Sequence, residues 1–199
     1  MTTLVTVAEG SCPVAREVTR RAASSLGVPA VATWAADLPA ALRRVVGSYA
    51  VVPMLLAEET ALSGAPGSPG RTLGPHPLLA AAQASRLLAA GARPGRPVVL
   101  VGAGPADRLH GAASLLADTW TGPVQVATLD AGGPAPADVA GRGAVVSPYL
   151  LAPGPLHDRL RDEALAAGAA VVAEPIGAHR FVADLVARRY RAHVHATAA

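Results

Sequence analysis

The sequence contains a single cysteine, Cys12, and no long apolar run. One cysteine cannot form a disulfide within the chain, and no charged and then apolar leader precedes the first apolar segment. Both features favour a cytoplasmic protein over a secreted one. Gly, Pro or polar residues interrupt every apolar stretch before it reaches the roughly 20 residues that a membrane-spanning helix requires. We therefore expect no membrane insertion.

Lysine is absent, and aromatic residues make up only 3% of the sequence. All 17 basic residues are arginines, a bias that is typical of GC-rich genomes and says little about mechanism. The net charge of +3 would suit nucleic-acid binding, but the arginines alternate with acidic residues and few rings can stack on bases. The densest basic run, at Arg188, Arg189 and Arg191, is predicted to be a solvated helix end. We expect no nucleic-acid partner.

Glycine and proline are abundant, with 20 and 18 residues, and they fall between short apolar runs. Such runs alternate with longer helical patterns, which predicts parallel β-sheets covered by α-helices. The 51% hydrophobic content of 199 residues is sufficient for a sizeable core. We expect strands near residues 3–8, 28–33, 49–56, 97–102, 123–128, 144–151 and 170–174. We expect helices near residues 13–26, 37–47, 76–91, 106–119, 155–168 and 179–192.

Three pairs of matching segments indicate an internal repeat with a nearly constant separation. Residues 4–11 match 98–105, residues 51–57 match 146–152, and residues 73–76 match 176–179. The last pair ends in His76 and His179, each at the start of a predicted helix. Because these two histidines are related by the repeat, we interpret them as structural.

The segment 91–97 is rich in Gly and Pro and is the predicted junction between the two copies. We expect an α/β protein with two similar lobes, residues 1–92 and 97–199, each a parallel sheet flanked by helices. A pseudo-twofold internal repeat would relate the lobes. Two fused lobes can form a cleft that a half-length protein must build by dimerising, so we expect a monomer.

Five segments in the same order resemble the CbiX/SirB family of sirohydrochlorin chelatases. The first strand ends in Ala-Glu-Gly-Ser at residues 8–11, where the family has a small residue followed by His-Gly-Ser. The element Leu-Gly-Pro-His-Pro-Leu-Leu stands at residues 73–79. The other matches are residues 53–57, residues 148–154 followed by 156–160, and residues 173–179 with the closing 186–190. The resemblance covers nearly the whole chain and implies a chelatase-like fold with a cleft between the lobes.

The resemblance implies insertion of a substrate metal, Fe²⁺ or Co²⁺, into sirohydrochlorin without a tightly bound cofactor. A tetrapyrrole is then the expected small-molecule partner. The chemistry requires a group that holds the metal and a group that accepts two pyrrole protons, and neutral imidazole can do both. The sequence departs from the family at this point. Glu9 replaces the strand-end histidine, and a second expected histidine falls near Ala61.

Candidate site residues follow from the resemblance and from the rule that open α/β sheets bind ligands at the carboxyl ends of their strands. Catalytic roles are assigned to Glu9 and His157, and metal binding to Glu9, Cys12 and His157. The residues assigned to the macrocycle are Ser11, Leu56, Ala61 and Arg71. Further candidate cations for its carboxylates are Arg16, Arg20 and Arg159.

Two functions are consistent with the loss of the family histidines. In the first, Glu9 takes over as metal ligand and base, and the chain is an active chelatase of the siroheme or cobalamin pathway. In the second, the chain is a degenerate homologue that binds a tetrapyrrole or a partner protein without inserting metal, or a repurposed enzyme using the same cleft. An assay of the protein and of a Glu9→Ala variant distinguishes the two.

Overall fold

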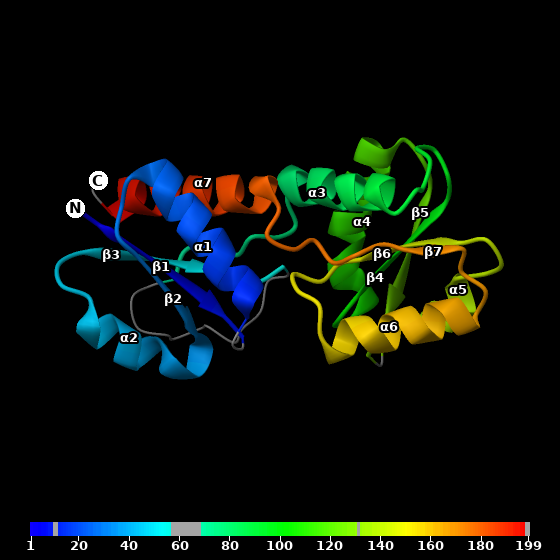
Figure 1. Cartoon of the computed structure of the whole chain (residues 1–199), viewed down its shortest axis with the longest axis horizontal. Coiled ribbons are helices and arrows are strands. Elements are labelled where there is room, and N and C mark those ends of the chain that lie inside the picture. Colours follow the sequence, from blue (N-terminus) through cyan, green and yellow to red (C-terminus); the bar gives the residue numbers. More distant parts are fainter. Residues whose placement is uncertain (10–11, 57–68, 131, 198–199) are drawn as a thin grey trace. The chain divides into compact units, whose positions relative to one another are not determined.

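The structure is a computed structural model and describes residues 1–9, 12–56, 69–130 and 132–197 (Figure 1). The chain forms two compact units, Met1–Gly74 with Ala178–Ala199, and Pro75–Gly177. Each unit contains a parallel β-sheet flanked by α-helices, which confirms the predicted α/β class. No helix in the described part of the chain is long and apolar enough to cross a membrane.

The sheet of the first unit has the strand order β2-β1-β3. Strand β1 (Thr3–Ala8) runs parallel to both β2 (Ala30–Trp34) and β3 (Tyr49–Pro53). All six residues of β1 are buried, as expected for a central strand that helices cover on both faces. The outer strand β2 is only partly buried.

Helices cover both faces of this sheet. On one face lies α1 (Pro13–Leu26), where the buried hydroxyls of Thr6 in β1 and Thr19 in α1 are 2.6 Å apart. On the same side, α7 (Arg180–Thr197) packs against α1 and β3. The opposite face is covered by the 3-10 turn η1 (Ala35–Asp37) and by α2 (Leu38–Arg44). The core on that face consists of Val5, Val7, Leu38, Leu42, Val51 and Leu55.

The sheet of the second unit has the order β5-β4-β6-β7. Its central strand β4 (Val98–Gly102) runs parallel to β5 (Val124–Thr128) and β6 (Val145–Pro148), and the two-residue strand β7 (Val171–Val172) extends the sheet beyond β6. The strand order of the first three strands repeats that of the first unit. Strand β7 is an addition late in the second copy.

The second sheet is also covered on both faces. Helices α3 (Pro77–Ala89) and α4 (Ala106–Trp120) lie on one face, where Gln83 of α3 donates a buried 3.0 Å hydrogen bond to Ser147 of β6. The other face is covered by α5 (Pro136–Val139) and α6 (Pro155–Ala166). The core there consists of Val99, Val101, Ala127, Leu129, Ala140, Val146, Leu160, Ala164 and Ala169.

The internal repeat extends to the strand register and the hydrogen bonds. Val7 pairs with Pro53 in the first sheet, and Val101 pairs with Pro148 in the second. The carbonyl oxygen of Val7 accepts the N–H of Met54 at 2.7 Å, and Val101 accepts that of Tyr149 at the same distance. These residues stand at matching positions of the repeat inferred from sequence.

The compact units differ from the predicted division into residues 1–92 and 97–199, because two helices are exchanged. Helix α3 of the first half packs with α4 and β6, which belong to the second half. Helix α7 of the second half packs with α1 and β3 of the first. The exchange is possible because the chain crosses between the units twice, at residues 74–75 and at residues 177–178.

Candidate functional site

The candidate site in the first unit begins at the carboxyl end of β1. Glu9 follows this strand directly, and its side chain is exposed. Cys12 is half-buried and is the N-cap residue of α1, with an extended backbone and no side-chain capping hydrogen bond. Pro13 starts the helix at a position where a missing N–H is tolerated. Ser11, which we assigned to macrocycle binding, lies outside the described residues.

The neighbouring strand β3 ends close to the same edge of the sheet, because β1 and β3 are parallel and paired. Leu55 follows β3, and its carbonyl oxygen accepts the N–H groups of Leu73 and Gly74 at 2.9 and 3.3 Å. These bonds hold Leu73 and Gly74, the last residues before the chain passes to the second unit, near the carboxyl end of β3. Leu56 is half-buried, and Ala61 lies outside the described residues.

Arg71 and Arg189 are among several arginines of the first unit whose charge no described acid neutralises. Arg71 is exposed, and Arg189 of α7 is half-buried and donates a 3.5 Å hydrogen bond to the carbonyl oxygen of Leu73. Burial, together with repulsion by Arg71, lowers the pKa of Arg189. Neither guanidinium forms an ion pair among the described residues. Arg71 and Arg189 are therefore suited to bind an anionic group.

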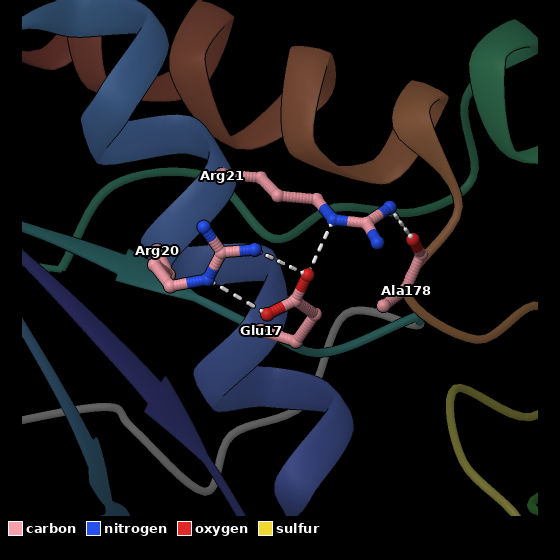
Figure 2. A network of polar contacts seen from close by, with 4 residues as sticks. All are labelled: Glu17, Arg20, Arg21 and Ala178. Carbon is pink, nitrogen blue, oxygen red and sulfur yellow. Dashed lines mark hydrogen bonds and ion pairs between the residues drawn. The ribbon is translucent and has the colours of Figure 1, made fainter.

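Two of the other candidate cations, Arg20 and Arg159, are engaged in local ion pairs, whereas Arg16 forms none among the described residues. Glu17 accepts hydrogen bonds from Arg20 at 2.7 and 2.9 Å and from Arg21 at 2.6 Å (Figure 2). These bonds lower the pKa of Glu17 to about 2. Arg21 also donates to the carbonyl oxygen of Ala178 at 2.7 Å, which ties α1 to the chain before α7. In the second unit, Arg159 bonds Glu163 at 2.7 Å.

His157 is the candidate residue of the second unit. It stands in the first turn of α6, after β6, and only 4% of its surface is exposed. Its Nε2 is buried and has no hydrogen-bond partner among the described residues. A buried polar atom without a partner is destabilising, which makes this nitrogen a candidate for binding a ligand or a proton.

The carboxyl end of β4, which matches that of β1 in the repeat, is arranged differently. Here the N–H of Gly104 donates to the carboxylate of Asp130 at 2.8 Å. This loop thus satisfies one of its backbone donors with an anion from its own chain. Nothing in the sequence singled out Asp130, because the residue follows β5 and reaches the loop only in the folded structure.

His76 and His179 cap helices, which agrees with the structural role expected from the repeat. The Nδ1 of His76 accepts the N–H of Leu78 at 3.1 Å, and the Nδ1 of His179 accepts that of Phe181 at 3.3 Å. An imidazole that accepts a backbone N–H in this way caps the helix as a Ser or Asp side chain would. The two histidines therefore have a structural role at the starts of α3 and α7.

The structure thus places Glu9, Cys12, Leu56 and Arg71 in the first unit and His157 in the second. Within the described ranges, no group of three or more His, Cys, Asp or Glu side chains could hold a metal ion. Sequence reasoning missed Arg189, which was assigned to a solvated helix end. The signal that identifies it is its contact with Leu73, distant in sequence.

No family model and no curated protein matches the sequence. Among solved structures, the chain resembles SirB from Bacillus subtilis with Fe³⁺, with a TM-score of 0.76, 20% identity, and coverage of 100% of this chain and 98% of that one. It also resembles the sirohydrochlorin chelatase SirB from Bacillus subtilis subspecies spizizenii in complex with cobalt, with a TM-score of 0.72, 19% identity, and coverage of 98% and 96%. The chain therefore has the fold of the sirohydrochlorin chelatase SirB over its full length, as the sequence resemblance predicted.

Proposed function

We propose that this protein is a sirohydrochlorin chelatase-like enzyme that inserts Fe²⁺ or Co²⁺ into a tetrapyrrole. The observation that carries the proposal is the likeness of the whole chain to SirB structures that contain iron and cobalt. The fold alone does not determine the chemistry, which depends on the residues of the site.

Metal insertion requires two pyrrole protons to leave as the metal enters. Glu9 is an exposed carboxylate at a strand end, which allows it to approach both a metal ion and a pyrrole nitrogen. Carboxylate and thiolate groups both bind divalent iron and cobalt, so Cys12 is a second candidate ligand from the same strand end. In this proposal Glu9 holds the incoming metal and accepts a proton, and His157 accepts or relays one through Nε2.

The macrocycle of the proposed substrate carries several carboxylates, which require cations. Arg71 and Arg189 lie close enough for repulsion to shift the pKa of Arg189, and they have no acidic partner among the described residues. We assign the carboxylates of the macrocycle to this pair. Arg20 and Arg159 are less suitable, because Glu17 and Glu163 already bond them. Contacts from Ser11, Leu56 and Ala61 remain part of the proposal.

A second candidate function is that of a degenerate chelatase, which binds a tetrapyrrole or a partner protein without inserting metal. The observation that favours it is the absence, within the described residues, of three clustered side chains that could hold a metal ion. A repurposed enzyme in the same fold would share this feature.

The test is the rate at which purified protein converts sirohydrochlorin and Fe²⁺ or Co²⁺ to the metallated product, followed by absorbance. We expect a rate above the spontaneous one. Loss of one positioned acid-base group commonly lowers a rate by about 10²- to 10⁴-fold, so Glu9→Ala should remove the gain. Glu174→Ala is the matched control, because it removes another exposed carboxylate, in the second unit.

Glu9→His gives the complementary measurement. If the natural protein matches the uncatalysed rate and Glu9→His accelerates insertion, the degenerate interpretation holds and the proposed activity is wrong. If Glu9→Ala changes the rate by less than about threefold, Glu9 carries no catalysis. Tetrapyrrole binding, measured by the shift of its absorbance, then separates a carrier from a protein with an unrelated function.

A further inference from the structure

Among the described residues, strand β2 is an edge of the sheet in the first unit with no strand on its outer side, because the order is β2-β1-β3. Its sequence, Ala-Val-Ala-Thr-Trp, contains neither a charged residue nor a proline. Soluble proteins usually protect edge strands with such residues, because an uncovered edge pairs readily with another strand. The composition of β2 therefore favours a partner strand at this edge.

The hydrogen-bond pattern shows which backbone groups point to the open side. The N–H of Leu4 donates to the carbonyl oxygen of Pro29 at 2.9 Å, and Leu4 is paired with Ala30. Residues 29, 31 and 33 therefore direct their backbone groups to β1, since these groups alternate along a parallel strand. Ala30, Ala32 and Trp34 direct theirs outward. Within the described residues, the outward N–H and C=O groups of Ala30 and Ala32 have no hydrogen-bond partner.

A groove of about 700 Å³ runs along this edge, between β2 and α2. Its wall includes the apolar side chains of Val31, Ala40, Ala41 and Val46. Val46 is 93% exposed, so it adds accessible apolar surface to this groove. The groove thus combines unpaired backbone groups with apolar surface.

The two charged residues of the groove stand at opposite ends of it. Asp37 follows the carboxyl end of β2, whereas Arg44 ends α2, which returns toward the amino end of that strand. Neither residue forms an ion pair in the described part of the chain. Suppose that a second strand pairs antiparallel to β2 and has the same two charges at its ends. Its arginine would then lie next to Asp37, and its acidic residue would lie next to Arg44.

We propose that β2 pairs antiparallel with β2 of a second copy of this chain, giving a twofold homodimer with one continuous sheet. The twofold axis passes beside Ala32. The backbone groups of Ala32 in the two copies then form hydrogen bonds with each other, and those of Ala30 form hydrogen bonds with the partner's Trp34. Asp37 then faces the partner's Arg44, and the same pair forms again across the axis. The apolar groove residues of the two copies cover each other. This proposal differs from the monomer that we expected from the two fused halves.

The experiment is sedimentation velocity and light scattering of the full chain over a wide range of protein concentration. We expect a reversible monomer–dimer equilibrium. Arg44→Asp places like charges together twice in the dimer, and should weaken it by about tenfold or more in dissociation constant. The double variant Asp37→Arg/Arg44→Asp restores opposite charges and should recover the dimer. Arg43→Asp makes the same change of charge on α2 outside the groove lining and should leave the dimer intact.

A second variant tests the strand pairing itself. Ala32→Pro removes an outward N–H that β1 does not use, so circular dichroism should show the native fold while the dimer is lost. The proposal is overturned if the natural protein is a monomer at all concentrations. It is equally overturned if a dimer forms that neither Arg44→Asp nor Ala32→Pro weakens, because another surface then holds the copies together.

Discussion

The phenol hydroxyl of Tyr190 donates a 2.6 Å hydrogen bond to the backbone carbonyl oxygen of Thr2. This bond joins α7, the last helix, to the start of the first strand, and both ends of the chain belong to the same compact unit. Tyr190 is also buried, with 7% of its surface exposed. The first unit therefore depends on residues from the end of the chain.

Tyr190→Phe should lower the free energy of unfolding by about 0.5–1.5 kcal/mol, because it leaves the partly buried carbonyl oxygen of Thr2 without its donor. Chemical denaturation measures the change. Tyr49→Phe is the matched control, since no hydrogen bond of the Tyr49 hydroxyl occurs among the described residues. Equal stability of the two variants would mean that the Tyr190 bond contributes nothing.

Acid should weaken the network around Glu17. Hydrogen bonds from Arg20 and Arg21 lower the pKa of Glu17 from 4.5 to about 2. A lowered pKa means that the folded state favours the ionised carboxylate. The resulting stabilisation is fully present above pH 4.5 and is lost as the pH falls toward 2. Glu17→Gln should flatten the dependence of stability on pH in this window, and an unchanged slope would contradict the prediction.

Alkali should destabilise the second unit through Tyr149. Burial raises the pKa of this phenol well above its usual value, because the ionised form is poorly solvated in the core. The stabilisation is present below the unfolded pKa of about 10 and is lost as the pH rises beyond it. The free energy of unfolding, measured by denaturant titration at neutral and at alkaline pH, should fall as the pH rises. Tyr149→Phe should make this decrease smaller. Tyr190 should contribute to the decrease that remains, because burial also raises its pKa.

Much of the fold was predictable because its signals are local in sequence. Alternation of apolar runs and helical patterns predicted each strand and long helix, and the repeat predicted that Val7 matches Val101 and Pro53 matches Pro148. The structure adds that the members of each copy are paired in the sheet. The exchange of α3 and α7 was not predictable. An amphipathic helix shows in its sequence which face is apolar, but it does not show which of two similar sheets that face will cover.

The candidate site was predictable only in part, for the same reason. Glu9 and Cys12 were identified because they directly follow a strand. Arg189 was not, because its position depends on the packing of α7 against the segment that contains Leu73. The burial of His157 also depends on tertiary packing, whereas its position at a helix start was evident from the preceding Gly-Pro.

The cap of α3 gives a stability prediction with a conservative control. His76→Ala removes the acceptor for the N–H of Leu78, and N-cap losses of this kind lower the free energy of unfolding by about 0.5–2 kcal/mol. His76→Asn should retain most of the stability, because Asn is a preferred N-cap. Metal insertion per folded molecule should not change in either variant. A loss of activity without a loss of stability would instead give His76 a functional role.

His157 distinguishes function from stability most directly. Its Nε2 is buried without a hydrogen-bond partner among the described residues, so this nitrogen contributes no hydrogen bond to the stability of the described fold. Replacing such a group by an apolar side chain of similar size can be neutral or stabilising, because it removes the desolvation penalty. His157→Leu should therefore leave the free energy of unfolding unchanged or raise it by up to about 1–3 kcal/mol.

If His157 accepts a proton or holds the metal, His157→Leu should at the same time lower the rate of metal insertion by about 10²-fold or more. His110→Leu is the control, because it makes the same replacement at an exposed histidine of α4. A stable but inactive His157→Leu protein supports a functional imidazole, because the loss of activity then does not follow from a loss of folded protein. A destabilised variant that inserts metal at the natural rate per folded molecule would show that His157 serves packing alone, and metal binding would then rest on Glu9 and Cys12.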